Sequence, residues 1–282
     1  MKCPNCNEEI EDDSKFCSQC GTKIEQSCPK CNNVISQDAK FCSNCGYKLV
    51  DSGNGNYELE NACKALNNGD YQKAFYWFKK SAEQGNSYGQ YFLAHCYRQG
   101  QGCLVDEEKA FYWYKKSAEQ GDFCAQDSLA SCYEDGIGCL VDEGKAFYWY
   151  KKSAEQGNSL GQLNLARCYE EGIGCLVDKE KAFYWYKKSA EQGNSEGQAV
   201  LGLHYFFGIG CCIDKEKAFY WYEKSAEQGN ANGEWCLGIC YELGIGTEKS
   251  YLKAYELYKK SAEQGNPDAM NNLKKLEELG IK

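Results

Sequence analysis

The sequence predicts a mainly α-helical protein, an αα-solenoid preceded by two small cysteine-rich units. Three observations support this fold class. A block that begins Lys-Ala-Phe-Tyr-Trp returns every 36 residues, glycines recur at the same interval, and eight of the 20 cysteines fall within residues 1–50. A fixed period of this length indicates a stack of helical units in which each unit contacts only its neighbours.

The composition disfavours several classes of protein. The 282 residues are 26% charged and 14% aromatic, which argues against a disordered chain. The 32 basic and 41 acidic residues give a formal net charge of -9, which disfavours a general nucleic-acid binder because phosphates would be repelled. No apolar run reaches the roughly 18 residues of a membrane helix, and the start of the sequence has no secretory signal. We therefore expect a cytoplasmic protein without membrane contact.

The first 50 residues contain two copies of one cysteine pattern, C-x2-C-x10-C-x2-C. Two cysteines three apart can present both thiolates to one ion, and two such pairs complete a tetrahedral structural zinc site. A unit of about 25 residues buries too little apolar surface to fold alone, so we expect two structural zinc ions. A disulfide framework is the alternative, which the missing signal sequence disfavours. The predicted ligands are Cys3, Cys6, Cys17 and Cys20 in the first site and Cys28, Cys31, Cys42 and Cys45 in the second.

These two units resemble the short zinc-ribbon family, from Cys3 to Gly21 and from Cys28 to Gly46. The resemblance implies structural zinc and, often, contacts with protein or nucleic acid. Six lysines nearly balance seven acidic residues in residues 1–50, and four thiolates around each zinc add further negative charge. We therefore expect the ribbons to contact a protein rather than a nucleic acid.

The repeated part marks the ends of its own helices. An aspartate or serine precedes each Lys-Ala motif by three residues, where its side chain can cap a second helix. A glycine ends that helix, and the Asn or Asp that follows begins the next one. The predicted caps of the second helices are Asp70, Asp106, Asp142, Asp178, Asp214 and Ser250.

The fourth repeat carries Leu165-Ala166, Tyr169, Gly172, Gly174, Asp178, Lys181-Ala182, Trp185-Tyr186 and residues 189–193, Ser-Ala-Glu-Gln-Gly. This pattern resembles the Sel-1-like repeat, a relative of the tetratricopeptide repeat. The resemblance implies a right-handed αα superhelix and a role as an adaptor that assembles protein complexes. We predict a zinc ribbon in residues 1–25, a second in 26–50, a flexible linker in 51–56, and a solenoid of six helix pairs plus a C-terminal capping helix in 57–282.

One side of the first helices differs between the copies, while the other side barely changes. We interpret the divergent side as free from packing and as the concave surface that binds a protein or peptide. The alternative is that its apolar end packs against the C-terminal helix or another subunit. The predicted partner-binding residues are Tyr91, His95, Arg98, Arg167, Leu203, Phe206, Phe207, Trp235, Ile239 and Leu243.

Two further features of the repeats leave alternatives open. The tyrosines at 76, 112, 148, 184 and 220 either pack between units or form an exposed aromatic ladder. Twelve cysteines lie outside the ribbons, several of them in pairs seven apart. They are interpreted as buried thiols, with disulfides, redox sensing or a metal at His204, Cys211 and Cys212 as alternatives.

These features favour a non-enzymatic interaction scaffold, with the zinc ribbons as a second docking module. The sequence has no P-loop, dinucleotide-binding turn or nucleophile elbow, so we expect no enzymatic activity. A redox- or metal-responsive sensor and a secreted, disulfide-stapled effector are the alternatives.

Overall fold

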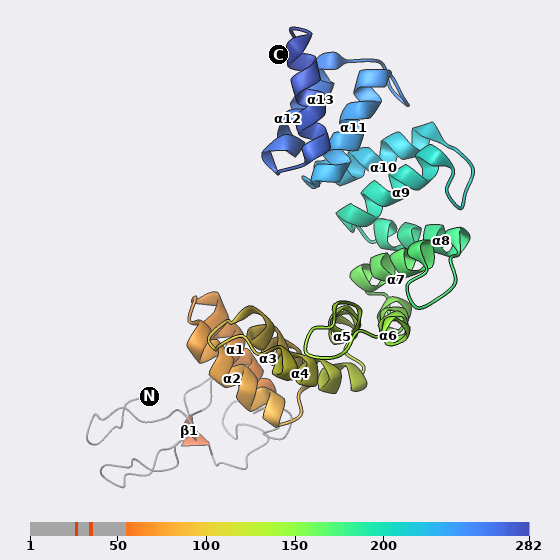
Figure 1. Cartoon of the computed structure of the whole chain (residues 1–282). Helices are drawn as coiled ribbons and strands as arrows, with labels where there is room; N and C mark the ends of the chain where they lie inside the picture. Colours follow the sequence, from red (N-terminus) through yellow and green to blue (C-terminus); the bar gives the residue numbers. More distant parts are fainter. Residues whose placement is uncertain (1–25, 28–33, 36–54, 282) are drawn as a thin grey trace. The chain divides into compact units, whose positions relative to one another are not determined.

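The computed structural model describes residues 26–27, 34–35 and 55–281 (Figure 1). Contacts divide the chain into two compact units, Met1–Gly89 and Gln90–Lys282, and the division falls within one helix. The described part of the first unit contains β1 (Gln26–Ser27), β2 (Val34–Ile35), α1 (Asn56–Asn67), α2 (Tyr71–Glu83) and the start of α3 (Ser87–Gln99).

The second unit continues from α3 in alternating first and second helices. Residues 55–281 as a whole contain six helix pairs and one final helix, which confirms the predicted αα-solenoid. The helices after α3 are α4 (Glu107–Glu119), α5 (Phe123–Asp135), α6 (Glu143–Glu155), α7 (Ser159–Glu171), α8 (Lys179–Glu191), α9 (Ser195–Phe207), α10 (Lys215–Glu227), α11 (Ala231–Leu243), α12 (Tyr251–Glu263) and α13 (Pro267–Glu278).

Side-chain caps begin the helices as the sequence predicts. Oδ1 of Asp106 accepts a hydrogen bond from the Lys109 amide at 2.9 Å, and Oδ1 of Asp122 accepts one from the Ala125 amide at 2.8 Å. At the other end, Gly136 has a φ of 73° and closes α5 in the left-handed region. The boundaries of the helices therefore follow from local sequence.

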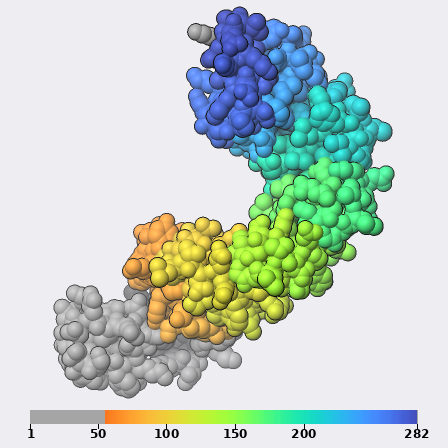
Figure 2. Space-filling model, viewed as in Figure 1, coloured from red at the N-terminus to blue at the C-terminus, as the bar shows by residue number. Residues whose placement is uncertain are grey.

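In the second unit, each pair of helices, called a layer below, packs on the next layer through its unchanging residues. Leu129, Leu165 and Leu201 on the first helices are completely buried, and Tyr150 on a second helix is 2% exposed. Figure 2 shows the layers of the second unit as a continuous row, and the first helices α5 and α7 also touch directly. The predicted packing side is thus confirmed. None of the helices in residues 55–281 has the length and apolar composition needed to cross a bilayer.

A row of buried glutamines also joins the layers. The side chain of Gln126 donates to the Ala118 carbonyl of the preceding layer at 3.2 Å and accepts from Gln156 of its own layer at 2.7 Å. In the last layer the same position is Glu234, which accepts from Gln264 at 2.8 Å and is only 5% exposed. This substitution places a carboxyl group where its predecessors carry an amide.

Candidate partner-binding surfaces

The divergent side of the first helices lies against the next layer. Nη2 of Arg167 on α7 is 2.7 Å from Oε2 of Glu134 on α5, and that oxygen also accepts from the Tyr150 hydroxyl at 2.8 Å. Burial disfavours the charge on Glu134, but the hydrogen bonds from Arg167 and Tyr150 outweigh it and lower the pKa of the carboxyl. Arg98 likewise reaches Ser131 of the following layer at 3.5 Å.

The next two layers are joined by a charged cluster around Glu170. Its carboxylate accepts from the Tyr186 hydroxyl at 2.8 Å, and Nζ of Lys179 lies 3.5 Å away. Nε2 of His204, a residue only 1% exposed, lies 3.4 Å from Oε1 of Glu170, while Nδ1 faces the Ile209 carbonyl at 2.9 Å. The imidazole contact lowers the pKa of Glu170 to about 2 despite its burial, and Tyr186 and Lys179 act in the same direction.

The apolar end of this side packs inside the molecule. Trp235 and Ile239 on α11 contact a cluster that includes Tyr258 and Leu276, and Leu276 belongs to the C-terminal helix α13. Leu203 and Phe206 pack against a neighbouring cluster around Tyr222, Cys236 and Leu237. Trp235 and Ile239 therefore pack as the alternative predicts, in a cluster with the C-terminal helix.

These contacts correct one premise of the sequence analysis. The divergent positions are not free from packing, because several of them pair with a side chain of the adjacent layer or pack in an apolar cluster. Tyr91, His95, Arg98 and Arg167 are half-buried, and two of the ten predicted residues are freely exposed. These two are Phe207, at 62%, and Leu243, at 59%, which end α9 and α11. Whether this surface binds a partner stays a prediction, with Phe207 and Leu243 as its accessible residues.

The second helices carry the exposed aromatic ladder. Tyr112, Tyr148, Tyr184 and Tyr220 are each 48–51% exposed, and Tyr76 in the first unit is 39% exposed. In three of the layers a lysine one turn later lies over the tyrosine ring at 5.7–5.8 Å from its centroid. The ladder is therefore a solvent-facing surface of stacked cation–π pairs.

The twelve cysteines of residues 55–281 are free thiols. The loop cysteine of each pair donates to the backbone carbonyl seven residues earlier, as Cys139 does to Cys132 at 3.3 Å. Burial raises the pKa of the Cys132 and Cys168 thiols to about 12. Residues 55–281 bring together no group of three or more metal-binding side chains, and Cys211 instead donates to the His204 carbonyl at 3.4 Å.

The eight predicted zinc ligands lie outside the described residues. The donor chemistry nevertheless fits the metal, since two sets of four thiolates match two tetrahedral zinc sites. The short strands β1 and β2 pair antiparallel, with Ser27 opposite Val34, and the sequence between them contains Cys28 and Cys31. If zinc binds, these thiolates hold it, and the ion supplies the stability that each small unit lacks.

Comparison with known families identifies both parts of the chain. The double zinc ribbon family model matches residues 3–46. The Sel1 repeat family model matches six segments, residues 66–86, 87–122, 125–158, 159–194, 195–230 and 234–266. The chain belongs to the Sel1 repeat family. Sel1 repeat proteins are generally protein-interaction scaffolds, and double zinc ribbons generally bind zinc.

Solved structures of Sel1 repeat proteins resemble this chain. A protective antigen of uropathogenic Escherichia coli strains is 36% identical with a TM-score of 0.72, and the match covers 81% of this chain and 50% of the antigen. The chain thus spans half the length of that antigen. A Sel1 repeat protein from Oxalobacter formigenes is 32% identical with a TM-score of 0.73, covering 77% of this chain and 89% of that one. No curated protein matches this chain.

Sequence reasoning missed the pairing between layers. The paired residues lie 33 or 34 positions apart, as Glu134 and Arg167 or Glu170 and His204 do, so they occupy different copies of the repeat. A signal was available in the exchange of charge between neighbouring copies, where an acid in one repeat precedes a base in the next. This signal could be recognised only if the register between adjacent first helices was already known.

Proposed function

We propose that this Sel1 repeat protein is a non-enzymatic scaffold that binds a protein or peptide at the exposed ends of its first helices. The observation that carries the proposal is the exposure of Phe207 and Leu243 beside a rigid, internally paired helix surface. Large apolar side chains on such a support are typical anchors for a partner protein. The half-buried Phe206 supports this surface, since its ring contacts that of Phe207 with the centroids 4.8 Å apart.

The ribbons supply a second docking module in this proposal, each stabilised by one zinc ion. The metal content of purified protein tests the stoichiometry, and two zinc ions per chain are expected. Cys3→Ser with Cys28→Ser should release both. A content that stays at two in the double variant would contradict the ligand assignment.

The twelve thiols of the repeats support a reducing compartment, and we place the protein in the cytoplasm. Fractionation of the source cells tests this placement. Recovery of the chain mainly outside the cytoplasm would contradict it.

Site-specific photo-cross-linking tests the scaffold function. A photoreactive amino acid at Leu243 or Phe207 should trap a discrete protein in the source cells. The matched control carries it at Leu279, which is 72% exposed on the end of α13. Phe207→Ser with Leu243→Ser should abolish co-purification of the trapped protein while helical circular dichroism stays unchanged. The proposal would be overturned if the photoreactive amino acid gave the same cross-linked proteins at Leu243 and at Leu279. It would also be overturned if the trapped protein still co-purified with the double variant.

Trp235 and Phe206, two other predicted partner-binding residues, are unsuitable positions for such variants. Both side chains pack inside the solenoid, so their replacement by alanine would destabilise it. Loss of partner binding would then report unfolding rather than a missing contact.

A further inference from the structure

Three consecutive loops of the second unit expose an apolar pair to solvent, and the next loop exposes Ile213. Leu104, Leu140 and Leu176 are 89–90% exposed, and the residue after each is 56–61% exposed. Exposed apolar side chains that gather into a large patch commonly mark an interaction site. We call this row the loop-edge stripe; its members are Leu104, Val105, Leu140, Val141, Leu176, Val177 and Ile213.

The backbone fixes each loop against the layer before it. Gly138 has a φ of 66°, and a side chain there would collide with the Glu107 carbonyl oxygen of α4. Gly174 is held in the same way against Glu143 of α6. The Asp142 amide also donates to the Tyr133 carbonyl at 2.8 Å. This amide bond recurs in all four loops, and Gly210 repeats the glycine contact against Lys179 of α8. The exposed apolar residues therefore recur at a constant position along one edge.

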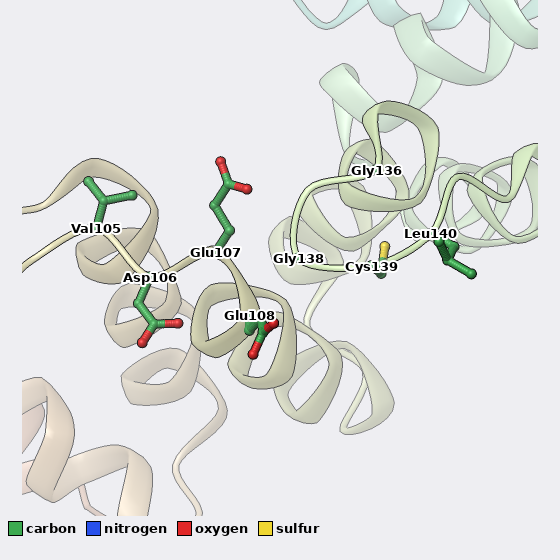
Figure 3. A pocket seen from close by; sticks show the side chains of 8 residues that line it. All are labelled: Val105, Asp106, Glu107, Glu108, Gly136, Gly138, Cys139 and Leu140. Carbon is green, nitrogen blue, oxygen red and sulfur yellow. The ribbon is translucent and has the colours of Figure 1, made fainter.

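A pocket separates the first two loops of the stripe (Figure 3). Val105 and the acidic residues 106–108 lie on one side of it, and the loop with Gly138 and Leu140 lies on the other. The charge of Asp106 is paired with Lys109 at 2.7 Å. Glu107 and Glu108 are exposed and form no ion pair within residues 55–281. The pocket therefore combines apolar side chains with two unpaired carboxylates.

Charge also limits what can cover the stripe. Anionic lipid headgroups would be repelled by Glu107 and Glu108, and pairing with the same edge of a second copy would bring like carboxylates together. The stripe ends in the fifth loop, where Glu248 and Lys249 occupy the corresponding positions. The apolar surface thus extends over four loops, and the carboxylates of Glu107 and Glu108 lie at its first loop.

We propose that the loop-edge stripe binds an extended segment of a partner protein in which apolar side chains alternate with lysine or arginine. The apolar side chains cover the leucines, and the basic residues pair with the carboxylates of the acidic end. This surface lies on the loops rather than on the helix ends that carry Phe207 and Leu243. The two surfaces can therefore be tested separately.

A library of random 12-residue peptides displayed on phage, selected on the full chain, tests the proposal. Leu104→Gln, Leu140→Gln and Leu176→Gln together should keep the fold, because these side chains pack on little. The selected peptides should be rich in apolar residues interleaved with Lys or Arg. A synthetic selected peptide should bind the triple variant about tenfold or more weakly, as expected when apolar anchors are lost. Glu107→Gln with Glu108→Gln should weaken binding of the same peptide and make that binding less dependent on salt.

The matched control is Leu160→Gln with Leu252→Gln, which removes two leucines that are 52% and 57% exposed elsewhere. Peptide binding should be unchanged in this control and in Phe207→Ser with Leu243→Ser. Equal binding to the triple variant, or selected peptides without basic residues, would overturn the proposal. The proposal would also be overturned if the natural chain co-sedimented with lipid vesicles, or formed a dimer in analytical ultracentrifugation, and the triple variant did not.

Discussion

The buried carboxyl of Glu234 should make the last layer less stable than its predecessors at neutral pH. In the layer before it, Gln198 donates to the Ala190 carbonyl at 3.2 Å and accepts from Gln228 at 2.8 Å. Glu234 keeps the bond from Gln264, but a carboxylate has no hydrogen to donate to the preceding layer. Glu234→Gln should therefore add one hydrogen bond and remove a buried charge.

The expected gain is about 1–3 kcal/mol at pH 7, of which the hydrogen bond supplies about 1 kcal/mol and the removed desolvation the rest. Lys260 attracts the carboxylate and reduces this gain. The gain corresponds to a rise in Tm of about 2–12 °C for a unit of this size.

The pH dependence has a definite sign. Burial raises the pKa of Glu234 above its ordinary value, against the opposing effects of Lys260 and Gln264. The protonated carboxyl then stabilises the folded chain fully below about pH 4, and this stabilisation is lost as the pH rises through the raised pKa. The difference in stability between Glu234→Gln and the natural chain should consequently be largest at neutral pH and shrink on acidification.

Thermal unfolding followed by circular dichroism at pH 7.5 and at pH 4.5, with hydrogen exchange in α11 and α12, measures this difference. Gln198→Glu is the matched control and should cause a comparable loss at neutral pH. If Glu234→Gln is neutral or destabilising at pH 7.5, or if its advantage grows at low pH, the reasoning is wrong.

Three other predictions concern the contacts between layers and the thiols. A double-mutant cycle of Glu134→Gln and Arg167→Met should give a coupling of about 1 kcal/mol in chemical denaturation at neutral pH. Since the pKa of Glu134 is lowered, that coupling should persist until the pH falls below the ordinary glutamate range, and a coupling near zero would contradict the pairing. Gly138→Ala should destabilise the chain by about 1–3 kcal/mol. Gly144→Ala lies on a helix where the new Cβ would meet only Oδ1 of Asp142 at an ordinary 3.6 Å, so it should stabilise the chain by about 0.5–1 kcal/mol; equal effects on Tm would refute the loop packing. In zinc-loaded protein treated with iodoacetamide, mass spectrometry should find Cys63 and Cys212 modified first, and rapid modification of the buried Cys132 or Cys168 would refute the assigned burial.

Much of the fold could be predicted because the same capping and packing residues recur at the same positions of each repeat. Asp106 and Asp142 cap helices, Gly136 ends one, and Leu129 and Leu165 face the neighbouring layer. All of these depend on residues a few positions apart or on a pattern repeated in phase. The helix boundaries and the packed side therefore needed no knowledge of the three-dimensional register.

The candidate site was less predictable because variation between copies has two physical origins. A position can vary because it is largely exposed, as at Phe207, or because its partner varies with it, as at Glu134 and Arg167. Sequence alone presents both as divergence. The exposure of Leu140 could not be predicted for a related reason, since an apolar residue two positions after a loop glycine gives no indication of which way it faces.

Hydrogen exchange of the full chain with and without the protein trapped at Leu243 tests the scaffold account most directly. The account predicts slowed exchange at the C-terminal ends of α9 and α11 when the partner is bound, and unchanged exchange in the exposed helix α13. Protection confined to segments away from α9 and α11 would contradict it.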